Sequence, residues 1–340
     1  MENRSLTLAV DMFGCPNRCR HCWIGHMPNR AMEEGADAWL VNYFRPYFNS
    51  IAFYSWLREP DFCDDYVQRW HRDNQISVNT SPMRFELASF WRIVRDPRYI
   101  DFLKEVGVKK VQLTFFGMEE LTDQYTGRKG AFQELLDATE ILIANQIAPR
   151  WQAFINEENK DEIVQLLSLI DSLKLEERCS TFHENFKFFV HSGSCDGENR
   201  KLYKIRIEKD HIPEALIPYY MDYEKVLTER ECCSLLRNDT SNVVYHNGDA
   251  IVLNISNQYD VYFNFTHMTQ AWKIGNLKSD NQDEIIRKIK EEDIPALNLA
   301  RRIPVCELAE KYGDKQSDKA FFIDDYKSYL LNHYLENVLG

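Results

Sequence analysis

Three cysteines lie close together near the N-terminus, in the segment Gly14-Cys15-Pro16-Asn17-Arg18-Cys19-Arg20-His21-Cys22-Trp23, with the spacing C-x3-C-x2-C. Three thiolates on one short loop can each bind one iron of a cubane [4Fe-4S] cluster, which leaves the fourth iron open to another ligand. The spacing therefore predicts a cluster with an open coordination position. A zinc site is the alternative, but zinc normally takes a fourth Cys or His, and His26 is the nearby candidate.

The composition is that of an ordinary globular protein. The chain has 340 residues, 44% of them hydrophobic, which is enough for one large domain and a smaller one. A signal-peptide pattern and an apolar run of ~20 residues are both missing, so we expect a soluble, cytoplasmic protein without a membrane partner. The formal charge of −12 disfavours nucleic acid as a partner. Nine cysteines, an odd number, do not resemble a disulfide framework.

Short apolar runs alternate with amphipathic segments from Leu6 to about His191. Strands are predicted at Leu6–Met12, Ile51–Trp56, Ile76–Asn79, Val108–Phe116, Ile147–Ile155 and Phe186–Val190. Helices are predicted at Ala36–Phe48, Asp64–Asn74, Phe90–Val106, Ala131–Gln146 and Asp161–Leu175. The alternation predicts an α/β fold of parallel βα units, a barrel or a doubly wound sheet. Active residues should follow the C-terminal ends of strands, as the three cysteines do.

The cysteine segment resembles the signature of radical S-adenosylmethionine (radical SAM) enzymes, C-x3-C-x-aromatic-C, with His21 where that family places a ring against the adenine. The resemblance implies a partial (βα)6 TIM-like barrel over residues 1–192. It implies a [4Fe-4S] cluster whose open iron chelates the amino and carboxylate groups of SAM. It also implies an external electron donor of the flavodoxin or ferredoxin type, and reductive cleavage of SAM to methionine and the 5′-deoxyadenosyl radical.

Further residues resemble the family's contacts to SAM. Glu59, in a Leu-Arg-Glu-Pro stretch, corresponds to the Glu of a Gly-Gly-Glu-Pro-like motif that binds the amino group, although both glycines are missing. Asn79 and Ser81 resemble ribose contacts, and Arg128 corresponds to a basic residue that pairs with the carboxylate. Gln152 is expected to face the barrel interior near the substrate. An ordinary turn, a surface arginine and a satisfied core amide are the alternatives.

The pattern changes over residues 193–340, where a small, separate α+β unit is expected. Ser194–Arg200 is polar and is interpreted as a linker or surface turn. Two alternating runs, Val243–Ile255 and Tyr259–Phe265, predict a hairpin. Helices are predicted at Asp283–Glu292 and Phe321–Val338.

The order of motifs in this part resembles a SPASM or twitch extension: Cys232-Cys233, the hairpin, a Lys-Ile-Gly-Asn stretch from Lys273, and then Cys306. The hairpin contains no cysteine, whereas an auxiliary cluster takes about four thiolates. We therefore expect a degenerate extension without a second cluster, one incomplete auxiliary cluster being the alternative. Cys232, Cys233 and Cys306 are then candidate hydrogen-atom donors, and buried structural thiols are the other interpretation.

The sequence therefore predicts an enzyme that uses a [4Fe-4S] cluster and SAM to abstract a hydrogen atom from a peptide or a small metabolite. The competing hypothesis is a non-catalytic protein that binds zinc or an iron–sulfur cluster for a structural or sensing role.

Overall fold

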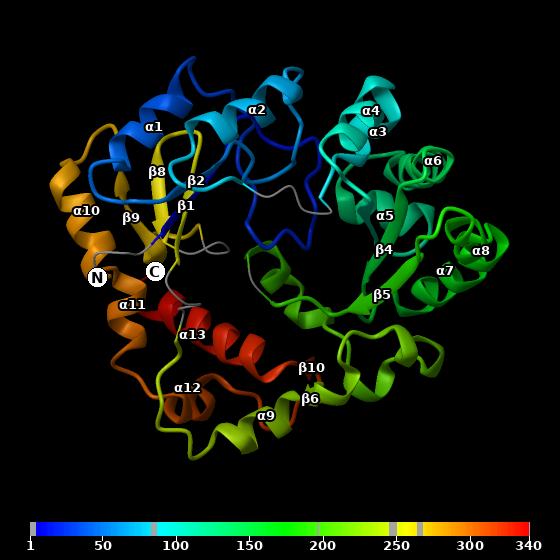
Figure 1. Cartoon of the computed structure of the whole chain (residues 1–340). Coiled ribbons are helices and arrows are strands. Elements are labelled where there is room, and N and C mark those ends of the chain that lie inside the picture. Colours follow the sequence, from blue (N-terminus) through cyan, green and yellow to red (C-terminus); the bar gives the residue numbers. More distant parts are fainter. Residues whose placement is uncertain (1–4, 83–86, 196, 245–249, 264–267, 340) are drawn as a thin grey trace.

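The computed structural model describes residues 5–82, 87–195, 197–244, 250–263 and 268–339 (Figure 1). Its strands are β1 (Ser5–Val10), β2 (Ile51–Tyr54), β3 (Lys110–Phe115), β4 (Ala148–Phe154), β5 (Lys187–His191), β6 (Leu227–Thr228), β7 (Ala250–Ile255), β8 (Asp260–Phe263), β9 (Lys273–Asn276) and β10 (Ala320–Phe321). One sheet has the order β2-β1-β7-β8-β9, a second has the order β3-β4-β5, and β10 pairs with β6.

The α-helices are α1 (Ala36–Phe44), α2 (Tyr66–Ile76), α3 (Phe90–Arg95), α4 (Arg98–Glu105), α5 (Glu119–Thr126), α6 (Ala131–Ala144), α7 (Lys160–Ser172), α8 (Leu175–Ser180), α9 (Glu229–Leu236), α10 (Gln282–Glu291), α11 (Pro295–Ala300), α12 (Val305–Tyr312) and α13 (Ile323–Leu339). Short 3-10 helices, including η1 (Gly197–Ile205), η3 (Glu214–Tyr219) and η4 (Tyr223–Lys225), connect β5 to β6.

The fold is α/β, with parallel strands and their helices arranged as a partial TIM-like barrel. β1 pairs with β2 in parallel, and β3, β4 and β5 also pair in parallel. In Figure 1 the two sheets lie on either side of the molecule, α9 and α12 lie along its lower edge, and α13 lies above them. The C-terminal ends of β1 to β5 carry the site described below.

The predicted third strand, Ile76–Asn79, is wrong. Ile76 is the last residue of α2, and only Val78 pairs with β2, through an isolated antiparallel bridge to Ile51. The hydroxyl of Ser77 binds two backbone groups: it accepts a hydrogen bond from Phe53 N and donates one to Asp73 O. A side chain that bonds to nearby backbone in this way replaces ladder bonds and prevents a regular strand.

The predicted helix Phe90–Val106 is two helices, α3 and α4, which are separated at Asp96 and Pro97. Proline has no N–H to donate inside a helix but is well suited to its start. Pro97 therefore ends the first helix and begins the second.

The C-terminal part is not a separate unit, contrary to the expectation. β7 pairs with β1 in parallel over six residue pairs, from Ser5 with Ala250 to Val10 with Ile255. One hydrophobic core contains side chains of β1, α1 and β2 together with side chains of β7, α10 and α13. The supposed linker is also partly buried, because Cys195 is 1% and Asn199 6% exposed. The predicted hairpin is confirmed as β7 and β8, although its residues 245–249 and 264–265 lie outside the described residues.

Within the described ranges, no helix combines the length and the apolar character that crossing a membrane requires.

Candidate active site

The three clustered cysteines lie on the loop between β1 and α1, and this loop is closed by side-chain bonds to its own backbone. The Asn29 amide binds both backbone groups of Cys15, accepting from its N at 3.1 Å and donating to its O at 2.8 Å. The Met27 carbonyl accepts from Arg18 at 2.7 Å and from Arg58 at 2.9 Å. These bonds hold the beginning and the end of the loop together.

Two segments from later in the chain fix the middle of the loop. Arg18 N donates to Thr126 O and Arg20 N donates to Tyr125 O, both at 2.8 Å, which ties the loop to the end of α5. On another side, Glu198 N donates to Cys22 O at 2.7 Å. The thiol loop is therefore held by backbone contacts that the packing of α5 and η1 provides.

The contact with η1 requires a glycine at position 197. Gly197 has φ +52°, and a Cβ there would lie 2.1 Å from Trp23 O and 2.7 Å from Cys22 O. We expect Gly197→Ala to displace the loop and to reduce the iron retained after anaerobic reconstitution severalfold, because backbone strain of ~1–3 kcal/mol falls on the cluster ligands. Gly107→Ala is the matched control, since Gly107 also has positive φ, +80°, but open space around it. Equal iron content in both variants would contradict this prediction.

The thiols of Cys15, Cys19 and Cys22 are partly buried and influence one another. Burial raises the pKa of the Cys19 thiol well above its usual value, and the charges of Cys15 and Cys22 raise it further. Burial, followed by the Glu59 charge, raises the pKa of Cys15 to about 12. Three thiols within electrostatic reach of one another need a cationic centre to ionise, and iron supplies one.

The donor set fits a cubane cluster with one thiolate for each of three irons. Across the described residues, no group of three or more His, Cys, Asp and Glu side chains forms the ligand set of a single metal ion. His26, the candidate fourth zinc ligand, has its Nε2 atom 2.9 Å from Cys19 O.

A cavity of about 980 Å³ opens beside the cysteine loop. Cys19, His21 and Glu59 lie on its wall, together with side chains from the C-terminal ends of β3, β4 and β5. Pockets for small molecules have volumes of ~300–1,000 Å³, so this cavity has room for a second reactant beside a cofactor.

Glu59 contributes a buried carboxylate oxygen that lacks a hydrogen-bond donor. No described residue donates to its Oε1 atom. Burial raises the pKa of Glu59 to about 7, although a hydrogen bond with Ser89 and the charge of Arg128 act in the opposite direction. A buried carboxylate of this kind is well suited to a cationic ligand group.

Beside Glu59 on the cavity wall, Arg58 is already neutralised. It forms an ion pair of 2.9 Å with Asp11, and the two side chains are 4% and 1% exposed. The pair joins the end of β1 to the segment after β2 and shapes the wall without offering a free charge.

Arg128 follows α5 and lies close to Glu59 and the cysteine loop. Its Nε donates to Asn17 Oδ1 at 2.9 Å, and its Nη1 lies 2.6 Å from Glu134 Oε2. Its buried Nη2 has no hydrogen-bond acceptor among the described residues. The guanidinium therefore has one buried donor group without an acceptor among the described residues, although Arg128 is not one of the residues that line the cavity.

His21 packs against two phenylalanine rings that are also stacked on each other, with their centroids 5.9 Å apart. Its ring centroid is 4.5 Å from that of Phe116 and 4.3 Å from that of Phe154. Burial, together with the charge of His191, lowers the pKa of His21 to about 3, so the ring is neutral at physiological pH. A neutral imidazole packed against two aromatic rings provides a largely apolar surface.

A row of hydrogen-bonded side chains crosses the inner face of β3, β4 and β5. Arg150 donates to Gln112, Gln112 to Gln152, and Gln152 contacts the His191 ring. Burial lowers the pKa of His191 to about 4, with the Arg206 charge acting in the same direction. Gln112, Gln152 and His191 line the cavity and give it a neutral polar surface.

The remaining predicted site residues are not among those that line this cavity. Neither Asn79 nor Ser81 lines it, and Asn79 lies near the beginning of β2, where its Nδ2 donates to Asn49 O at 2.7 Å. Cys233 and Cys306 line a different, smaller pocket, and Cys232 is fully buried in the core. The structure therefore brings His21, Glu59, Gln152 and the cysteine loop together, with Arg128 close by, and does not bring the other five residues to them.

Sequence reasoning did not identify Asn17, Asp11 or His191 as site residues. His191 follows the predicted strand Phe186–Val190 directly, so the rule that active residues follow strand ends could have found it. Asp11 and Arg58 carried no such signal, because their pairing depends on two strands lying side by side.

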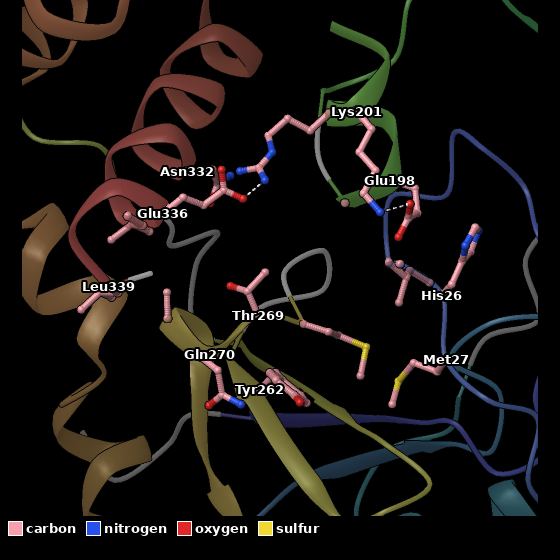
Figure 2. Close-up of a pocket in the computed structure, with 17 residues that line it drawn as sticks. His26, Met27, Glu198, Lys201, Tyr262, Thr269, Gln270, Asn332, Glu336 and Leu339 are labelled. Carbon is pink, nitrogen blue, oxygen red and sulfur yellow. Dashed lines mark hydrogen bonds and ion pairs between the residues drawn. The ribbon is translucent and has the colours of Figure 1, made fainter.

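A second pocket, of about 500 Å³, lies against the other side of the cysteine loop. Figure 2 shows His26 and Met27 of the loop on one side and Leu339 of α13 on the other. The ion pair between Lys201 and Glu198 lies above the pocket in this view. Ile24 lines both this pocket and the cavity, so the tip of the loop separates them.

The chain is similar to proteins of a known family. Residues 10–170 match the model of the Radical SAM superfamily. A comparison with curated proteins finds no match. Among solved structures, native anSMEcpe with bound AdoMet and Cp18Cys peptide is 12% identical, with 98% of this chain and 99% of that chain covered and a TM-score of 0.50. SuiB from Streptococcus suis bound to S-adenosylmethionine is 11% identical, with 92% and 73% covered and a TM-score of 0.45. HemN, the coproporphyrinogen III oxidase from Escherichia coli, is 10% identical, with 98% and 91% covered and a TM-score of 0.40.

Proposed function

We propose that this chain, whose residues 10–170 form a radical SAM superfamily domain, abstracts a hydrogen atom from the carbon skeleton of a peptide or a small metabolite. Its cofactors are a [4Fe-4S] cluster and SAM, and the chemistry that they supply when bound is the reductive cleavage of SAM to a radical. One observation carries the proposal. The three thiols lie beside a cavity whose wall also contains a buried carboxylate oxygen without a hydrogen-bond donor.

Each residue of the site has a role that its surroundings support. Cys15, Cys19 and Cys22 would bind three irons. Glu59 would accept the ammonium of SAM with its unpartnered Oε1, and Arg128 would donate to the SAM carboxylate with its unpartnered Nη2. These two groups have opposite charges, as the two ends of an amino-acid moiety require.

The aromatic side chains and the polar row would orient the reactants. His21, which packs against Phe116 and Phe154, would contact the adenine with its neutral ring. Gln152 and His191 would then face the substrate with neutral donors and acceptors. The electron would come from an external donor of the flavodoxin or ferredoxin type.

The test is anaerobic reconstitution followed by incubation with SAM and dithionite. We expect about four irons per chain, with labile sulfide, and formation of 5′-deoxyadenosine. Iron and sulfide without any 5′-deoxyadenosine would refute the proposed enzyme and would favour a structural or sensing role for the cluster. One zinc per chain and a colourless protein would refute the cluster itself.

A further inference from the structure

The row of side chains on the inner face of β3, β4 and β5 has a direction, and Arg150 sets it. A guanidinium can only donate hydrogen bonds, so Gln112 accepts from Arg150 with its Oε1 atom. Gln112 then donates to Gln152 Oε1, and Gln152 donates to Nε2 of His191. Because each amide has one accepting and one donating end, the direction passes unchanged along the row.

This direction determines which ring nitrogen of His191 carries the hydrogen. Nε2 accepts from Gln152, so the neutral ring has its hydrogen on Nδ1. Gly193 N, however, points its own N–H at Nδ1 over 3.3 Å. Two N–H groups therefore face each other at this end, because the row has donors at both ends and one acceptor too few. A ligand atom that accepts from both would relieve the conflict.

A second observation is the side chain of Asn199 on η1, which is 6% exposed and lines the same cavity. Neither end of its amide has a hydrogen-bond partner in the described part of the chain. The amide lies directly against Gly193, where a Cβ would collide with its Nδ2 atom. A side chain buried to this extent loses its water when a ligand fills the cavity, and it then needs both an acceptor and a donor in exchange.

These two observations define the hydrogen-bonding group that fits here. His191 and Gly193 together require an acceptor, and Asn199 requires an acceptor and a donor. A secondary amide offers both, with its carbonyl oxygen and its N–H. A carboxylate or an ester offers acceptors only, and would leave Oδ1 of Asn199 without a donor.

The charges around the cavity favour a neutral group over an anion. Asp324 and Asp325 line it, and Lys225 is neutralised by Asp222 at 3.2 Å. Arg206 does not line it, and its guanidinium donates to oxygen atoms of the chain itself. An incoming carboxylate would therefore meet negative charge without a cation to pair with.

We propose that the substrate places a secondary amide between His191 and Asn199, with its carbonyl oxygen at the Nδ1–H of His191 and its N–H at Oδ1 of Asn199. This inference rests on the proposed function, because the same cavity would hold SAM against the cysteine loop. The amide supplies the acceptor that the row lacks and replaces the water that Asn199 loses. Arg150 acts through two glutamines and is a positioning residue, since it directs the His191 donor without touching the substrate.

The hydrogen on the His191 ring is located in long-range proton–nitrogen spectra of the reconstituted holoenzyme with SAM, an oxidised cluster and isotope-labelled histidine. We expect it on Nδ1 in the wild type. In Arg150→Met the row loses one donor end, so the Gly193 N–H sets the direction and the hydrogen moves to Nε2. Lys187→Met is the matched control that keeps the wild-type tautomer. Lys187 pairs with Arg150 across the strands and also lies over the Phe189 ring, but it forms no hydrogen bond with the described side chains of the row.

The same spectra test the amide itself. N-methylacetamide, added to about 0.5 M because two neutral hydrogen bonds hold a small molecule only weakly, should shift the His191 ring signals saturably. Acetate and methyl acetate, which lack an N–H, should give no saturable shift. Asn199→Leu, which keeps the shape of the side chain, should abolish the response to N-methylacetamide. Ser194→Ala, a change at another polar residue on the cavity wall, should keep it.

Several results would overturn the inference: a wild-type ring with its hydrogen on Nε2, an Arg150→Met ring with its hydrogen still on Nδ1, or equal shifts with acetate and N-methylacetamide. If Arg150→Met does not fold, the wild-type tautomer and the response of Asn199→Leu decide. Formation of 5′-deoxyadenosine by the same preparations is measured separately. Product without the expected ring signals would leave the proposed function intact, and absence of product would refute that function whatever the ring shows.

Discussion

Replacement of Cys19 by alanine is expected to lower 5′-deoxyadenosine formation by more than about 10³-fold. Cys19 is the one thiol of the three that lines the cavity, and its pKa is raised by burial and by both other thiols. Its removal takes away one of three ligands, so that a cluster with an open iron is no longer held. Iron per chain and product are measured together after anaerobic reconstitution.

Cys63→Ala is the control for this experiment. Cys63 is a partly buried thiol that packs against the second hydrophobic core and does not line the cavity. The control should keep both its iron and its activity. A Cys19→Ala protein that loses iron but still cleaves SAM would contradict the assignment of the cysteine loop as the reacting centre.

The second large effect is expected from Glu59→Gln, which should weaken SAM binding by about 10- to 150-fold. This range corresponds to the loss of a charge-assisted hydrogen bond of ~1.5–3 kcal/mol. The amide keeps the shape of the side chain but removes the charge that an ammonium would meet. Because the charge of Glu59 is costly to bury without a ligand, the variant should unfold no more easily than the wild type.

Equilibrium dialysis of two ligands makes this prediction specific. SAM should lose affinity for Glu59→Gln, whereas 5′-methylthioadenosine, which lacks the amino-acid moiety, should bind both proteins equally. Glu120→Gln, an exposed substitution on α5, should change neither affinity. An equal loss for the two ligands would show that Glu59 shapes the cavity rather than binding the ammonium.

Much of the α/β pattern could be predicted because it follows from the local spacing of apolar residues along the sequence. β1, β3 and β4 are short apolar runs, and α6 and α7 repeat apolar residues every three to four positions. The third strand was predicted because the apolar residues Ile76 and Val78 alternate with polar ones, as in a strand. The prediction is wrong because α2 continues to Ile76 and the Ser77 hydroxyl forms a hydrogen bond with β2. A tertiary contact overrode the local pattern there.

Helices α9, α11 and α12 were not predicted, since each is a short segment of six to eight residues. Periodicity needs a longer window to distinguish such a segment from a loop. The capping box of Thr228 and Glu231 at the beginning of α9 was the available signal.

The sequence by itself determined the chemistry of the cysteine loop, because three thiols within eight residues remain neighbours in any compact fold. It also placed this loop and Glu59 directly after predicted parallel strands, which is where active residues of such folds lie. Only the tertiary structure decided what faces them. β7 pairs with β1 across more than two hundred residues, and with it α13 comes to line the cavity with Asp324 and Asp325. Such long-range pairing depends on packing between distant segments, which local sequence patterns do not record.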